Sequence, residues 1–133
     1  MPELSILLAD DDAEDLELME AALCSVEPEI KVHKVSNGKE VVDYLSSLQN
    51  KNLPSLIILD YNMHELTGSE VLSIINKDNR YISIPKIILS TSNNPVYKQY
   101  SLIDGATEYF VKPDNIDDLN KLAKKMLSYC NPT

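Results

Sequence analysis

The stretch Ile6–Asp12, ILLADDD, joins an apolar run directly to three consecutive acids. The strand expected here, Ser5–Asp10, is apolar on both faces, which is typical of a central strand in a parallel sheet covered on both sides. Two further runs have the same character, LIILD at Leu56–Asp60 and KIILS at Lys86–Ser90. The chain thus places polar side chains at the ends of three strands that we expect to be buried.

Two more strands and five helices complete the expected order. The alternating, lysine-containing segment Ile30–Val35 suits an edge strand, and TEYFVK at Thr107–Lys112 suits a last strand. Apolar residues at helical spacing predict helices near residues 13–24, 41–48, 68–76, 95–104 and 116–128. Five β-α units in a row predict an α/β fold with a parallel sheet. Right-handed crossovers favour the flavodoxin-like, doubly wound strand order 2-1-3-4-5.

Composition narrows the classes of function. The 133 residues suit one domain, 1–133, with no effector domain expected. The net charge of −9 disfavours a nucleic-acid partner, because an acidic surface repels a phosphate backbone. No apolar run approaches ~18 residues, so no membrane span is expected, and no secretory signal is found. Cys24 and Cys130 have no metal-type spacing, so two reduced thiols in a cytoplasmic protein are expected.

Chemically active side chains stand at the ends of four strands. In a doubly wound sheet, ligands bind beyond the carboxyl ends of the strands, where strands one and three diverge. The residues expected there are Asp10, Asp11 and Asp12 after the first strand, then Asp60, Ser90 and Lys112. Two carboxylates ~5 Å apart repel by roughly 3 kcal/mol at an effective dielectric near 20, so a cation or a raised pKa is needed. An oxygen-rich site of this kind suits Mg²⁺, which would let a phosphoryl group approach an anionic nucleophile.

A simpler interpretation of the acids is a solvated turn at a helix N-terminus. Asp12 fits it as an N-cap, with Glu14 and Asp15 in the first helical turn. It explains neither Asp60 nor Lys112. Because a hydroxyl and an ammonium suit the oxygens of a phosphoryl group, the phosphoryl interpretation accounts for more of the pattern.

These residues resemble the receiver domain of two-component response regulators, over about residues 4–129. The matching motifs are ILLADDD at Ile6–Asp12, LIILDYNMHELTG at Leu56–Gly68, IILSTS at Ile87–Ser92 and YFVKP at Tyr109–Pro113. The resemblance implies a stand-alone receiver, somewhat like those that serve phytochrome-type kinases. Such a protein takes phosphate from a histidine kinase or a phosphotransfer protein and signals through a separate protein target or through a homodimer.

The resemblance also implies roles for residues of the site. Asp60 would be the phosphoacceptor. Asp10, Asp11 and Asp60 would hold Mg²⁺, together with the backbone carbonyl of Asn62. The phosphoryl group would be bound by Ser90, Thr91 and Lys112.

Further roles concern conformational change. Ser90 and Tyr109 would form a switch in which Tyr109 turns inward when Asp60 is phosphorylated, and the Lys112–Pro113 peptide would be cis. The altered surface would comprise the fourth helix, the fifth strand and the last helix. The chain departs from the family pattern at His64, which stands where proline is usual, and in carrying Ser90 and Thr91 where threonine and a smaller residue are common.

Two rival classes share parts of this pattern. A phosphohydrolase of the haloacid-dehalogenase type uses an Mg²⁺-dependent aspartate nucleophile after its first strand, in an Asp-x-Asp pattern, and adds a cap. Here the candidate follows the third strand, in Asp60–Tyr61–Asn62, and no insertion is long enough for a cap. A flavin or nucleotide binder needs a Ser/Thr- or Gly-rich loop after its first strand. Residues Asp10–Asp15 instead carry five acids in six positions, which repel phosphate unless a metal intervenes.

Overall fold

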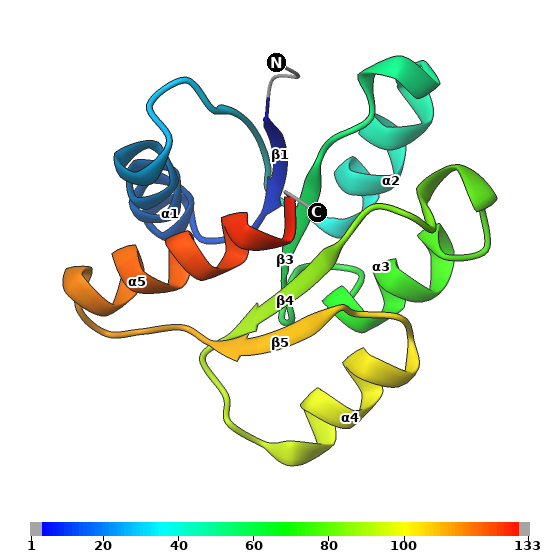
Figure 1. Cartoon of the computed structure of the whole chain (residues 1–133). Helices are drawn as coiled ribbons and strands as arrows, with labels where there is room; N and C mark the ends of the chain where they lie inside the picture. Colours follow the sequence, from blue (N-terminus) through cyan, green and yellow to red (C-terminus); the bar gives the residue numbers. More distant parts are fainter. Residues whose placement is uncertain (1–3, 131–133) are drawn as a thin grey trace.

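Five parallel strands form the centre of the molecule. The computed structural model describes residues 4–130. The strands are β1 (Ser5–Ala9), β2 (Lys31–Val35), β3 (Leu56–Asp60), β4 (Lys86–Ser90) and β5 (Glu108–Val111). They lie in the order β2-β1-β3-β4-β5, and every neighbouring pair is parallel (Figure 1). The predicted flavodoxin-like strand order is therefore confirmed.

Helices cover both faces of this sheet. They are α1 (Ala13–Val26), α2 (Gly38–Ser47), α3 (Gly68–Ile75), α4 (Pro95–Ile103) and α5 (Ile116–Leu127). Helices α1 and α5 lie side by side on one face, and α2, α3 and α4 cover the other (Figure 1). Three short 3-10 turns were not predicted, at Asn50–Asn52, Asn79–Tyr81 and Ser128–Cys130. A three-residue turn has too few positions to show a period in the sequence.

The burial of the strands follows their place in the sheet. Every residue of β3 and β4 is buried, whereas most of β2 is exposed, as expected for an edge strand. Because side chains alternate along a strand, the sheet separates two apolar cores, one under α1 and α5 and one under α2, α3 and α4. This packing fixes the ends of β1, β3, β4 and β5 relative to one another.

Caps begin the helices directly after the strand ends. The Asp12 side chain accepts hydrogen bonds from the backbone N–H groups of Glu14 and Asp15, which confirms its predicted role as the N-cap of α1. Asn94 caps α4 in the same way, with Pro95 in the first helical position. The loops after β1 and β4, residues 10–12 and 91–94, are short and hold their polar side chains close to the sheet edge.

Candidate functional site

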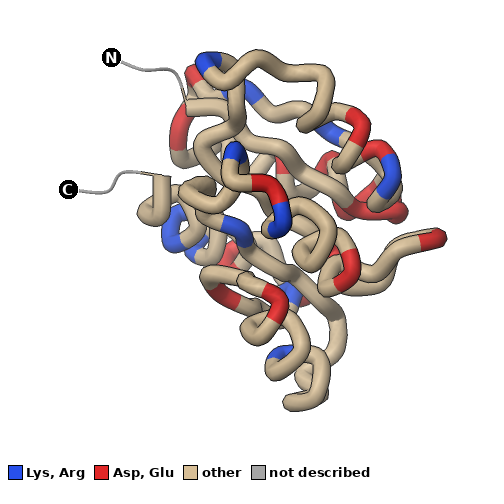
Figure 2. Tube along the Cα trace, turned by 90° about the vertical axis from the view of Figure 1, so that its right-hand side faces the viewer, with Lys and Arg blue, Asp and Glu red and all other residues tan. Residues whose placement is uncertain are grey.

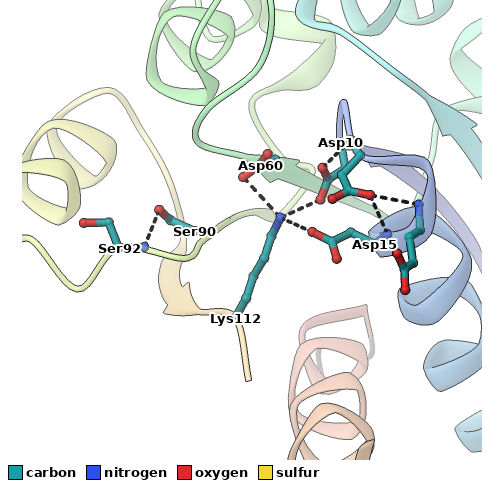
Figure 3. A network of polar contacts seen from close by, with 8 residues as sticks. Asp10, Asp15, Asp60, Ser90, Ser92 and Lys112 are labelled. Carbon is teal, nitrogen blue, oxygen red and sulfur yellow. Dashed lines mark hydrogen bonds and ion pairs between the residues drawn. The ribbon is translucent and has the colours of Figure 1, made fainter. Parts of the chain in front are cut away.

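Three carboxylates meet at the carboxyl edge of the sheet. Asp10 follows β1 and Asp60 ends β3 (Figure 3). Asp11 comes next to Asp10 in the loop to α1. Each offers a carboxylate oxygen, and these oxygens all lie within 4.8 Å of one another. Asp10 and Asp60 are buried and Asp11 is exposed. A dense group of Asp and Glu positions lies on the right of Figure 2, in keeping with the net charge of −9.

Lys112 supplies the positive charge of the site. Its Nζ donates hydrogen bonds to Asp10 Oδ2 at 2.7 Å and to Asp15 Oδ2 at 2.9 Å, and forms an ion pair with Asp60 Oδ1 at 3.5 Å (Figure 3). Burial alone would lower the pKa of Lys112, but its hydrogen bonds to Asp10 and Asp15 and the nearby charge of Asp60 raise that pKa above its ordinary value. The ammonium therefore stays charged at every physiological pH.

Asp60 is the carboxylate whose ionisation is most disturbed. Burial raises the pKa of Asp60 to about 7, and the charge of Asp10 adds to this effect. The charge of Lys112 opposes the shift without cancelling it. A divalent cation among these oxygens would favour the ionised carboxylate, so the donor set and its electrostatics fit a hard cation.

The loop after Asp60 is held close to the strand ends. Tyr61 donates its backbone N–H to the Leu89 carbonyl, and its own carbonyl accepts from the N–H of Gly68, both at 2.8 Å. A Cβ at Gly68 would stand only 2.8 Å from the Asp60 carbonyl oxygen, so the loop needs a glycine there. Asn62 and His64 are exposed in this loop. The carbonyl of Asn62 as a metal ligand stays a prediction.

The hydroxyl candidates occupy different surroundings. Ser90 is fully buried at the end of β4, and its Oγ accepts a hydrogen bond from the Ser92 N–H at 3.0 Å. Leu89 of β4 is paired with Asp60 of β3, and Ser90 is the next residue of β4. Ser90 therefore lies one residue farther toward the carboxyl edge of the sheet than Asp60. Thr91 is exposed. The structure thus brings Ser90 to the sheet edge beside β3 and leaves Thr91 at the rim.

Tyr109 lies inside the molecule. Its ring is 7% exposed, and its hydroxyl donates to the Ser92 carbonyl at 2.7 Å. The inward turn of Tyr109 on phosphorylation of Asp60 stays a prediction. A buried ring with a satisfied hydroxyl is stable in this position, and a switch would have to change its hydrogen bond or its packing.

The expectation of a cis Lys112–Pro113 peptide was wrong. Within residues 4–130, every peptide bond is trans. The trans form is favoured by ~0.5–1 kcal/mol for a bond that precedes proline. Lys112 reaches both Asp10 and Asp60 with the trans form, so its ion pairs do not require the cis one.

The sequence analysis missed the part played by Asp15. We assigned it only to the first turn of α1, whereas its carboxylate is a hydrogen-bond partner of Lys112. A signal was present in the sequence. A helix that is separated from a strand by only three residues, 10–12, holds its first turn against the sheet edge, so an acid at its third position can face the strand ends.

The fold and the site define an α/β domain with clustered carboxylates and a lysine at the carboxyl edge of its sheet, and the comparison with known families gives the class of protein. A family model described as "Response regulator receiver domain" matches residues 6–124. The chain belongs to this family, the receiver domains of two-component response regulators.

Individual relatives show the same relationship. The two-component response regulator ORR11 of Oryza sativa subsp. indica is 32% identical over 122 residues, which are 92% of this chain and 80% of the relative. The crystal structure of the phosphorylated cyanobacterial phytochrome response regulator RcpA matches with a TM-score of 0.86 and 29% identity, over 96% of this chain and 94% of that one. The Mn²⁺-bound form of response regulator Rcp1 matches with a TM-score of 0.81 and 28% identity, over 96% and 93% of the two chains.

These findings decide between the classes considered above. The relatives named above are response regulators, so a phosphohydrolase of the haloacid-dehalogenase type is excluded as the class of this chain.

A separate finding concerns membranes. No helix within residues 4–130 has both the length and the apolar character needed to cross one.

Proposed function

We propose that Asp60 accepts a phosphoryl group from a phosphohistidine of a histidine kinase or a phosphotransfer protein. The supporting observation is the position of Asp60, a buried carboxylate at the strand edge with Asp10, Asp11 and Lys112 around it. One oxygen of Asp60 forms a bond to phosphorus while the bond between phosphorus and the histidine nitrogen breaks. The freed imidazole nitrogen keeps the electron pair and takes up a proton.

The metal of this site is proposed to be Mg²⁺, held by carboxylates of Asp10, Asp11 and Asp60 and by the Asn62 carbonyl. Two observations support a divalent cation: the clustered oxygens of this chain and the Mn²⁺ bound to the related response regulator Rcp1. When bound, the cation offsets the repulsion between the carboxylates and an incoming phosphoryl dianion. Asp10 contributes twice, because it also accepts a hydrogen bond from Lys112 and so orients the ammonium.

The remaining phosphoryl oxygens are assigned to Lys112, Ser90 and Thr91. Lys112 supplies a permanent positive charge at 3.5 Å from Asp60 Oδ1. The Ser90 hydroxyl can donate to a phosphoryl oxygen while its oxygen still accepts from Ser92. Thr91, at the exposed rim, could add a second donor. The chain would then catalyse only its own phosphorylation and dephosphorylation.

Output is proposed to pass through the face made by α4, β5 and α5 to a protein partner or to a second copy of the chain. Helix α4 exposes Val96, Tyr100 and Ile103, which recur at helical spacing, and Ile103 is 79% exposed. Val111 and Ile116 add exposed apolar surface from β5 and α5. The similar protein RcpA is a phytochrome response regulator, which supports a phytochrome-type kinase as the phosphate donor.

The location completes the proposal. A cytoplasmic location agrees with Cys24 and Cys130, which form no disulfide with each other.

Incubation with acetyl phosphate and Mg²⁺ tests the proposed function. Intact-mass measurement should show one phosphoryl adduct on the wild-type chain and none on Asp60→Asn. The adduct should decay without turnover of other phosphate esters. Sustained hydrolysis of many esters, or an equal adduct on Asp60→Asn, would overturn the proposal.

A further inference from the structure

We propose that Asp15 is a positioning residue that holds Lys112 on the α1 side of the site, and that a phosphoryl group on Asp60 competes with Asp15 for the Lys112 ammonium. This inference rests on the proposed function and adds a residue outside the metal cluster. The Lys112 ammonium has three protons to donate. One goes to Asp10 at 2.7 Å and one to Asp15 at 2.9 Å, whereas Asp60 lies at 3.5 Å, beyond a normal hydrogen bond.

The place of Asp15 separates it from the metal ligands. It stands in the first turn of α1, where its backbone N–H is fixed by the side chain of the N-cap Asp12. Asp10, Asp11 and Asp60 form the cluster of converging oxygens, and Asp15 is not part of it. Within residues 4–130, the Asp15 carboxylate therefore makes polar contacts only with Lys112, from which it accepts a hydrogen bond (Figure 3).

Burial makes this contact stronger than an ordinary surface ion pair. The Lys112 side chain is 14% exposed and that of Asp15 is 35% exposed. Charges partly removed from water attract each other more strongly than exposed ones. Asp15 therefore competes effectively for the ammonium that a phosphoryl group on Asp60 would need.

The surroundings leave Lys112 room to move. A cavity of about 60 Å³ lies beside the site and is lined by, among others, Asp15, Leu18, Asp60, Lys112 and Pro113. The cavity thus leaves free volume beside Lys112 for a shift of its ammonium toward Asp60. A phosphoryl group, with about two negative charges, would draw it in that direction.

Loss of the Asp15 charge should then favour the phosphorylated arrangement. It frees a donor of Lys112, and it lowers the negative charge met by an incoming anionic donor. We expect Asp15→Asn to be labelled by acetyl phosphate about fivefold faster than the wild type, with Mg²⁺ saturating. Asp15→Glu, which keeps the charge, should return toward the wild-type rate.

Asp12→Asn is the matched control. It removes one negative charge from the same turn, asparagine is an equally good N-cap, and Asp12 has no contact with Lys112 among the described hydrogen bonds and ion pairs. It should change the labelling rate by less than about twofold, since the lost charge makes no contact with Lys112 and exposed charges are screened by salt. Thermal unfolding of both variants checks that neither rate reflects partial unfolding.

A second readout needs neither metal nor phosphate. The NMR signal of the Lys112 Nζ ammonium in the metal-free chain should shift in Asp15→Asn and stay in place in Asp12→Asn. If Asp60 accepts no phosphate, the proposed function fails while this signal still tests the Asp15 contact. Labelling of Asp15→Asn that is equal to or slower than that of Asp12→Asn, or an unmoved Lys112 signal, would overturn the inference.

Discussion

The ring of Tyr61 stacks on the ring of Tyr97, with centroids 4.5 Å apart and an angle of 17° between the planes. Tyr61 directly follows Asp60, and Tyr97 lies in the first turn of α4. The hydroxyl of Tyr109 is bonded to the Ser92 carbonyl, in the loop that leads into the same helix. One aromatic stack and one hydrogen bond therefore join the strand ends of the site to the helix that we propose as part of the output surface.

Removal of the stack should weaken the link between the site and α4. For Tyr97→Ala we expect normal phosphate uptake and smaller amide shifts on α4 when beryllofluoride, a mimic of aspartyl phosphate, is added. The free energy of unfolding should fall by about 1 kcal/mol, the typical worth of an aromatic pair. Tyr100→Ala, on the exposed side of the same helix, is the control and should change stability by less than ~0.5 kcal/mol. Full-sized shifts on α4 in Tyr97→Ala would exclude the stack as the link.

The raised pKa of Asp60 predicts how stability changes with pH. Its folded value of about 7 lies above the ordinary 3.8, so the folded state binds a proton more tightly than the unfolded chain. Stability should therefore decrease as pH rises from ~4 to ~7, because the charged form must be buried. In the absence of metal, Asp60→Asn should be more stable than the wild type at pH 8, by about 1–3 kcal/mol. Near pH 4 the variant should have no such advantage over the wild type.

Urea unfolding in EDTA at the two pH values measures this difference. Asp114→Asn removes an exposed carboxylate and serves as the control, with similar stability to the wild type at both values. A destabilised Asp60→Asn at pH 8 would show that the ion pair with Lys112 outweighs the cost of burial.

Metal binding should stabilise the fold without being required for it. The apolar cores contain no metal ligand, so the chain should stay folded in EDTA while labelling by acetyl phosphate stops. At pH 8, Mg²⁺ at tenfold its Kd should add about 1.4 kcal/mol to the free energy of unfolding. Asp11→Asn should lose most of this gain, and Asp12→Asn should keep it. Unfolding in EDTA, or an undiminished gain in Asp11→Asn, would show that these acids do not hold the ion as described.

Ser90 should matter more for signalling than for phosphate uptake. Ser90→Ala leaves the Ser92 N–H without its side-chain acceptor, at a cost of about 1 kcal/mol. We expect it to take up phosphate and to show reduced beryllofluoride shifts at Tyr109 and along α4. Ser90→Thr keeps the hydroxyl and should restore them. If the alanine variant responds like the wild type, the hydroxyl is not the switch.

Much of this account could be predicted because strand ends converge by topology. Once the runs at β1, β3 and β5 were identified, the parallel order brought Asp10, Asp60 and Lys112 to one edge without any knowledge of side-chain positions. The sequence pattern does not predict side-chain rotamers or small differences in conformational free energy. The buried position of the Tyr109 ring depends on its rotamer and its hydrogen bond, and the isomer before Pro113 depends on a preference of ~0.5–1 kcal/mol, neither of which periodicity encodes.

The identity of the residue that carries the phosphate is the most direct test of the central claim. The wild-type chain is phosphorylated with Mg²⁺ present, reduced with borohydride, which converts an aspartyl phosphate to homoserine, and mapped by peptide mass spectrometry. We predict homoserine at position 60 and nowhere else. Homoserine at Asp10 or Asp11, or label that resists borohydride and resides on His64, would contradict the assignment of Asp60 as the phosphoacceptor.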